Sequence, residues 1–227
     1  MAKIPILVLR LEGVLQSWGE RSKWDYRDSA ILPTKSGVVG LLGCALGWER
    51  GDSRLTKLNY SLNMAVRADR QGTEMVDFHT VQSLQLLNAQ GKLRGKKGEY
   101  GTLVTHRTYI QDACYTVVLS GEDRLLCEIC DSLQKPKWPI YLGRKSCVPS
   151  RPVCEGITRE YQSLLEAVEK LPFTTDPTDR DCLVEWEESG GNLQIERQDV
   201  NSGGREFHTR LVSRKIIHME VPADVSQ

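Results

Sequence analysis

Residues Pro33 to Gly47 read PTKSGVVGLLGCALG, and this stretch predicts a buried helix on which the rest of the fold is organised. Its apolar residues suit a helix, and Thr34 or Ser36 can cap the first turn by accepting hydrogen bonds from free backbone N–H groups. Glycines at positions 37, 40, 43 and 47 fall on one side of such a helix. Each costs about 0.5 to 1 kcal/mol of helix stability relative to alanine, so we expect close packing against a sheet or another backbone to compensate.

The length and composition of the chain limit its class. With 227 residues it forms one large domain or a domain with a substantial appendage. It lacks a run of about 18 apolar residues, so the sequence predicts no membrane span, and its N-terminus reads as a first strand and not as a signal peptide. Seven scattered cysteines favour a reducing, cytoplasmic location. Cys127 and Cys130 form a CxxC pair, but the other cysteines do not complete a good metal site, and neither a metal nor a cofactor is predicted.

Positive and negative residues balance at 30 each, so the net charge does not point to nucleic acid, but the distribution of charge does. Basic residues gather between Gly91 and Gly101 and again near residue 145, whereas acidic residues gather between 176 and 188. The sequence therefore predicts basic surfaces for phosphate and an acidic surface that faces solvent or protein. The members of the first basic group that we expect to contact RNA or protein are Lys92, Arg94, Lys96 and Lys97.

Short strands and helices alternate along the chain. The predicted elements are a strand at 4–11 buried on both faces, a hairpin of strands at 60–69 and 74–82, a strand at 106–120, a helix at 121–133 and a short helix at 159–170. Between the strands, residues 83–105 predict a long basic loop, which we expect to be an arm that orders on a partner; a merely solvated charged loop is the alternative. This order is close to the split β-α-β pattern of ferredoxin-like and RNA-recognition domains.

Two further loops combine aromatic, basic and small residues in a way that suits RNA. The QSWG loop at 16–19 leads into alternating aromatic and basic residues, which suit base stacking with phosphate contacts nearby; the alternative is that Trp18 and Trp24 cover the end of the core. In the YLGRKSC loop at 141–147, the glycine allows backbone approach, and the cations and hydroxyl beside it can hold a phosphate. The residues predicted to bind RNA are Gln16, Ser17, Trp18, Lys35, Ser36, Arg107, Tyr141, Gly143, Arg144, Lys145 and Ser146.

Four segments, the QSWG loop, the PTKSGVVGLLGCALG helix, the HRTYIQDACYTVVL strand and the YLGRKSC loop, together resemble the CasD family. This family is the "Cas five" subunit of the type I-E CRISPR surveillance complex called Cascade. The similarity covers nearly the whole chain and is weakest after about residue 155. It implies an α+β fold of the repeat-associated RNA-binding (RAMP) type, a modified ferredoxin-like, RRM-like core at 1–155 with a long basic thumb at 83–105 inserted in the sheet. A smaller, β-rich C-terminal extension at 156–227 would follow.

The resemblance also implies a function. Such a subunit caps the 5′ handle of the crRNA in antiviral defence, touches the large subunit and the adjacent backbone subunit, and meets target DNA in the assembled complex. CasD proteins of this type are generally held to be non-catalytic, whereas relatives in type I-C systems cut the repeat RNA themselves.

The residues leave two alternatives to a non-catalytic crRNA-binding subunit. Metal-independent RNA cleavage needs a base, an acid and a cation, and His106, Tyr109 and Lys97 could supply them. Histidines in strands are more often structural, however, and no acidic cluster suggests two-metal hydrolysis. The other alternative is a scaffold that touches only protein subunits.

Overall fold

The computed structural model describes residues 2–21, 25–87, 91–93, 98–173, 180–187, 194–203 and 206–219. Within these ranges the chain forms a mixed α+β fold. Its elements, in chain order, are β1 (Ile6–Glu12), β2 (Leu15–Gln16), β3 (Tyr26–Arg27), α1 (Lys35–Leu46), α2 (Ser53–Ser61), β4 (Asn63–Arg70), β5 (Thr73–Ser83), β6 (Gly101–Gln111), β7 (Cys114–Ser120), α3 (Asp123–Gln134), β8 (Cys154–Thr158), α4 (Leu164–Lys170), β9 (Asp181–Trp186), β10 (Gln194–Gly203) and β11 (Glu206–His218). No helix in the described part of the chain is long and apolar enough to cross a membrane.

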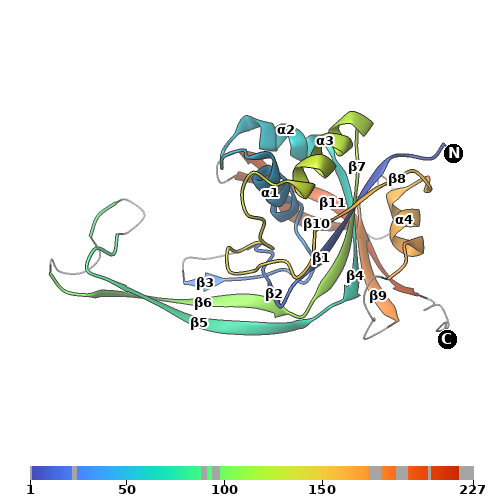
Figure 1. The fold of residues 1–227 in the computed structure, drawn as a ribbon. Helices are drawn as coiled ribbons and strands as arrows, with labels where there is room; N and C mark the ends of the chain where they lie inside the picture. Colours follow the sequence, from blue (N-terminus) through green and yellow to red (C-terminus); the bar gives the residue numbers. More distant parts are fainter. Residues whose placement is uncertain are drawn as a thin grey trace.

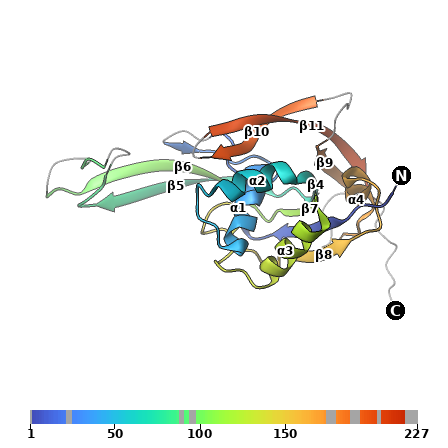
Figure 2. The same ribbon diagram turned by 90° about the horizontal axis from the view of Figure 1, so that it is seen from above.

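A seven-stranded sheet in the order β10-β11-β9-β4-β7-β1-β8 forms the centre of the molecule (Figure 1). All neighbouring strands in it run antiparallel. Helices α1, α2 and α3 cover one face, and α4 covers the other (Figure 2). Within this sheet, β1 connects through α1 and α2 to β4, and β7 connects through α3 to β8. The strands β9 to β11 extend the same sheet, and the expected domain boundary after residue 155 falls inside β8.

The strand β1 contributes side chains to both hydrophobic clusters of the core, one on each face of the main sheet. Leu7, Leu9 and Leu11 pack under α1 and α3, whereas Ile6 and Val8 pack under α4. Successive side chains of a strand point to opposite faces, so a strand with apolar residues at every position is covered on both sides. The predicted strand buried on both faces is therefore confirmed.

A buried charged cluster replaces apolar packing at one end of the α4 face. The Asp69 carboxylate accepts hydrogen bonds from Arg10, Arg67 and Thr116, and all four side chains are almost fully buried. The two arginines also donate to backbone carbonyls after α4, including that of Pro172. Removal from water is costly for charges unless each has a partner, and one carboxylate here serves two guanidinium groups. The cluster thereby fastens the segment after α4 to three strands of the sheet.

The long hairpin of β5 and β6 leaves the main sheet and projects from the molecule (Figure 1). The predicted pairing of 60–69 with 74–82 is wrong, since β4 pairs with β7 and β9 while β5 pairs with β6 along its whole length. The predicted single strand at 106–120 is also divided. Asp112 adopts a left-handed conformation, with φ of 55°, and there the chain passes from β6 into the main sheet.

The predicted loop at 83–105 is shorter than expected, because its ends belong to strands. Ser83 closes β5, and residues 101–105 begin β6. Lys92 is exposed near the tip of the hairpin. Of the other basic residues assigned to this arm, Arg94, Lys96 and Lys97 lie outside the described residues.

The helix α1 forms where the glycine-rich stretch predicts it. Thr34 caps its start by accepting a hydrogen bond of 3.3 Å from the backbone N–H of Gly37, and Gly47 ends it with φ of 72°. A Cβ at Gly37 would lie 2.8 Å from the ring of Trp18, and one at Gly43 would lie 2.5 Å from Leu55 of α2. Close packing therefore does compensate these two glycines, but the partners are side chains and not a sheet or a backbone.

Candidate functional site

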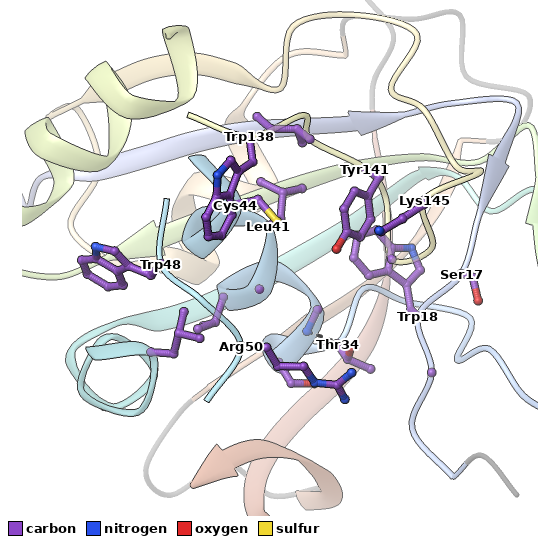
Figure 3. A pocket seen from close by; sticks show the side chains of 18 of the residues that line it. Ser17, Trp18, Thr34, Leu41, Cys44, Trp48, Arg50, Trp138, Tyr141 and Lys145 are labelled. Atoms are coloured by element: carbon purple, nitrogen blue, oxygen red, sulfur yellow. Dashed lines mark hydrogen bonds between the residues drawn. The ribbon is translucent and has the colours of Figure 1, made fainter. Parts of the chain in front are cut away.

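A groove with a volume of about 890 Å³ lies beside α1 (Figure 3). One wall is α1 itself, and the others come from the loop after α1, the loop after α3 and the QSWG loop. We call it the α1 groove and define it by the lining residues Trp18, Gly40, Arg50, Trp138, Tyr141 and Lys145. Three of these six, Trp18, Tyr141 and Lys145, belong to the residues predicted to bind RNA, and Ser17, Ser36 and Gly143 line the groove as well.

The aromatic wall of the α1 groove comes from the loop after α3. The backbone N–H groups of Lys137 and Trp138 donate to the carbonyls of Ala45 and Cys44 at distances of 2.9 and 3.2 Å, which fixes this loop on the last turn of α1. The ring of Trp138 remains 37% exposed. Burial and the neighbouring Cys44 raise the pKa of the Tyr141 phenol, so it keeps its proton at neutral pH and can both donate and accept hydrogen bonds.

Two cations line the α1 groove from different loops. Arg50 follows α1, and Lys145 follows α3 (Figure 3). Both side chains are exposed, and neither has a hydrogen bond or ion pair with another residue in the described part of the chain. Their charges are therefore available to an anionic ligand.

Gly40 gives the α1 wall its shape. It is the exposed member of the glycine stripe, and a Cβ built on it would meet no atom within 4 Å. Unlike the positions of Gly37 and Gly43, this position has no neighbouring side chain against a Cβ within the described part of the chain. The helix therefore presents bare backbone to the α1 groove at this position.

The QSWG and YLGRKSC loops meet at Gly143. Its φ is 92°, and a Cβ there would overlap the carbonyl oxygen of Ser17. The Ser17 N–H in turn donates to the carbonyl of Leu142 at 3.0 Å. The predicted close backbone approach at Gly143 exists, and its partner is the backbone of Ser17. Phosphate binding by this loop stays a prediction.

Arg144 is used inside the protein, which differs from its predicted phosphate contact. Its guanidinium donates to the carbonyls of Thr108 and Arg27 at 2.9 and 3.0 Å, and it stacks over the ring of Tyr109 at 4.5 Å. It thereby holds β3 and β6 against the YLGRKSC loop. The neighbouring Ser146 is exposed, outside the lining of the groove.

Lys35 is also used inside the protein, again in contrast to its predicted RNA contact. Its side chain is buried, with the ammonium 2.9 Å from a carboxylate oxygen of Glu187. Its backbone N–H donates to Asp199 at 2.7 Å, so a carboxylate of the protein already occupies the N-terminus of α1. Burial lowers the pKa of Lys35, and Glu187 opposes this shift.

The carboxylates near Lys35 belong to a network that joins the C-terminal strands to α1. Arg210 donates to Asp199 at 2.6 and 2.9 Å and to Glu187 at 3.1 Å. Glu185 pairs with Arg214 at 2.6 Å. We call this network the C-terminal clasp. Glu185 and Glu187, from the acidic segment predicted to face solvent or protein, are instead enclosed in ion pairs.

The QSWG loop is mostly interior. Gln16 is fully buried and donates to the carbonyls of Leu11 and Ala113, and the indole of Trp18 donates to Gln16 at 3.1 Å. With 1% of its surface exposed, Trp18 packs into the core, which agrees with the alternative that it covers the end of the core. Trp24 lies outside the described residues. Ser17 is buried too, and its hydroxyl donates to the carbonyl of Thr108.

The residues considered for RNA cleavage do not converge in the described part of the chain. His106 and Tyr109 lie three apart on β6, so their side chains leave opposite faces of the strand. His106 packs against the ring edge of Phe78, and Lys97 lies outside the described residues. Arg107 is half-buried and donates to the hydroxyl of Thr105 at 3.2 Å. Among the described residues, no group of histidine, cysteine and acidic side chains could hold a metal ion.

Comparison with known proteins gives consistent matches. A family model described as "CRISPR-associated protein (Cas_Cas5)" matches residues 6–220. The "CRISPR system Cascade subunit CasD" of Escherichia coli (strain K12) is 32% identical over 205 residues, which cover 85% of this chain and 87% of that protein. A solved "Crystal structure of Cas protein" is 35% identical with a TM-score of 0.72 and covers 96% of this chain and 98% of its own. A chain of a "CRISPR RNA-guided surveillance complex" is 30% identical with a TM-score of 0.75, covering 96% of this chain and 91% of its own.

Proposed function

Because the chain belongs to the Cas_Cas5 family of CRISPR-associated proteins, we propose that it is a non-catalytic crRNA-binding subunit of a Cascade surveillance complex. In this role it caps the 5′ handle of the crRNA and contacts the large subunit and the adjacent backbone subunit, and it meets target DNA in the assembled complex. The similarity to a Cascade subunit, and to a chain of an RNA-guided complex, supports this assignment.

The α1 groove is the observation that supports RNA binding at a particular site of this protein. Single-stranded RNA is held by aromatic side chains that stack on bases and by cations that neutralise phosphates. Trp138 offers an exposed ring, Arg50 and Lys145 offer unpaired cations, and the bare backbone at Gly40 leaves room for a base or sugar. We therefore assign handle binding to this groove, and not to the N-terminus of α1 or to Arg144.

Replacing Trp138 or Lys145 with alanine is expected to weaken handle binding in two distinguishable ways. Loss of a stacking ring costs about 1 to 3 kcal/mol of binding free energy at any salt concentration. Loss of one phosphate contact lowers the slope of log affinity against log salt by about 0.7 for a single strand. Fluorescence anisotropy of labelled handle RNA across a salt series measures both effects.

Lys3→Ala is the matched control for Lys145→Ala, because Lys3 is an exposed lysine near Glu166 of α4, on the face of the main sheet opposite α1. It should leave affinity and salt slope unchanged. Wild-type protein that fails to bind the free handle would favour the protein-only scaffold. Metal-independent cleavage of repeat RNA that disappears in His106→Ala would favour the endoribonuclease alternative.

Gly40 allows the groove itself to be filled without removing any existing contact. Gly40→Leu is expected to reduce handle affinity, because the side chain enters the α1 groove where no protein atom lies within 4 Å of its Cβ. The fold should not suffer, since leucine favours the helix by about 0.5 to 1 kcal/mol over glycine. Binding titrations and thermal unfolding of the same preparation measure the two effects.

Gly40→Ala is the matched control, because it adds the same helix propensity with a single methyl group. It should raise the melting temperature and leave RNA affinity nearly unchanged. Equal affinities for the leucine and alanine variants would place the RNA elsewhere.

We further infer that the centre of the main sheet is a ferredoxin-like core and that the hairpin of β5 and β6 is the thumb. The order β4-β7-β1-β8, with helices in the two β-α-β connections, matches the split pattern of that fold. The hairpin is inserted between β4 and β7, as a thumb would be. The thumb would then extend from residue 73 to 111, beyond the 83–105 segment expected from the sequence.

A further inference from the structure

Two cysteines that are distant in the sequence lie side by side in the fold. The Sγ atoms of Cys130, in α3, and Cys154, at the start of β8, are 3.2 Å apart. Both are free thiols; Cys130 is 8% exposed and Cys154 is half-buried. They belong to elements already packed together in the main core.

The two cysteines stand at the two ends of the segment that forms the aromatic wall of the α1 groove. Cys130 lies in the last turns of α3 and Cys154 begins β8, so the connection between them contains Trp138, Tyr141 and Lys145. A covalent bond between the two sulfurs would close this connection, with the aromatic wall inside it, into a covalent loop.

We propose that Cys130 and Cys154 are a redox-responsive pair that forms an internal disulfide when the protein meets a small-molecule disulfide oxidant. A disulfide bond is about 2.0 Å long, so the two Sγ atoms need to approach by only about 1.2 Å. Because Cys130 and Cys154 belong to one core cluster, the packing of α3 and β8 already holds the two thiols close together.

The reaction is an ordinary pair of thiol–disulfide exchanges. The thiolate of one cysteine, after giving its proton to solvent, attacks the oxidant RSSR and forms a mixed disulfide while RS⁻ leaves. The thiolate of the second cysteine then attacks the protein sulfur of that mixed disulfide and releases the other RS⁻. The protein loses two electrons and two protons, and the oxidant becomes two molecules of RSH.

The pair should resist brief exposure to oxidant. Burial, followed by the neighbouring Cys130, raises the pKa of Cys154 to about 12, and the thiolate is the attacking species. Glu155 adds to this shift and the backbone N–H of Gly156 opposes it. The disulfide should therefore form only under sustained oxidation, and once formed it restricts the unfolded chain between the two cysteines.

Incubating the full-length protein with excess oxidised glutathione tests the proposal. Free thiols, counted after denaturation, should fall from the seven in the sequence to five. A non-reducing peptide map should contain Cys130 joined to Cys154. The melting temperature should rise, trypsin should cut more slowly within the connection, and dithiothreitol should reverse both changes.

Cys127→Ser is the matched control, because Cys127 lies on the same helix one turn before Cys130. This variant should behave as wild type. Cys130→Ser and Cys154→Ser cannot form the bond, so they should lose no pair of thiols and their melting temperature should not rise with oxidant. A Cys127–Cys130 link, a stable glutathione adduct on either cysteine or an unchanged thiol count in wild type would overturn the proposal. None of these readouts uses RNA, so the result is independent of the proposed handle binding.

Discussion

Gly143→Ala is expected to destabilise the protein and to abolish tight handle binding together. A non-glycine residue in the left-handed region costs about 1 to 3 kcal/mol, and overpacking typically costs about 1 to 3 kcal/mol more. Both apply here, because φ is 92° and the new methyl group would overlap the Ser17 carbonyl oxygen. The YLGRKSC loop must then move away from the QSWG loop and take Lys145 with it. Urea unfolding and handle-RNA titration measure the two losses.

Gly98→Ala is the control that separates the energetic cost of the left-handed backbone conformation from the cost of the steric clash with Ser17. Gly98 has nearly the same φ, 88°, but a Cβ there meets no atom within 4 Å. Its loss of stability should be limited to the backbone term, and RNA affinity should change much less than in Gly143→Ala. Equal effects of the two substitutions would show that contact with Ser17 is unimportant.

Asp69→Ala is expected to cost about 3 to 5 kcal/mol of unfolding free energy, because it leaves two buried guanidinium groups without their carboxylate. This is a large part of the roughly 5 to 15 kcal/mol that stabilises a typical domain. Asp69→Asn should recover little, since it restores shape and hydrogen bonding but not charge. Denaturant unfolding of the three proteins measures the series.

Arg159→Ala is the control for this series, because its ion pair with Asp123 is more than half exposed on both sides. Exposed pairs contribute little, so the unfolding midpoint should barely move. An Asp69→Asn variant as stable as wild type would mean that the charge of Asp69 does not matter to the cluster.

The elements that the sequence predicts well are those specified by neighbouring residues. Thr34 and Gly47 mark the ends of α1 within one stretch, and the apolar run at 4–11 identifies β1 without any partner. The helix α2 is not among the predicted elements, although its signals are local too. Asp52 caps it, and Leu55, Leu58 and Leu62 follow at helical spacing.

Pairing between strands could not be predicted in the same way. The alternation at 74–82 indicates a strand but does not name its partner, and the partner β6 begins well after the turn at Gly72. Register is decided by packing between distant segments, which the pattern of one strand does not contain.

The side chains of the candidate site are also selected by tertiary contacts that the sequence pattern does not contain. Arg144 and Lys145 are adjacent cations, yet only Arg144 meets the Tyr109 ring and a set of backbone carbonyls, so only Lys145 remains free. Trp138 is not among the predicted contacts, because its exposure depends on how its loop docks on the end of α1. The sequence predicts RNA contact for these loops, and tertiary contacts decide which of their side chains remain available to a ligand.

The C-terminal clasp also sets an order of events during synthesis. Asp199, whose carboxylate accepts from the backbone N–H at the start of α1, lies 164 residues after Lys35. At about 5 to 20 residues per second, a ribosome needs roughly 10 to 30 s to travel that distance. Until the ribosome reaches Glu187, 152 residues after Lys35, the Lys35 ammonium lacks its partner carboxylate. The wall that α1 contributes is therefore fastened last, and a nascent chain completes its groove only when its final strands have been made.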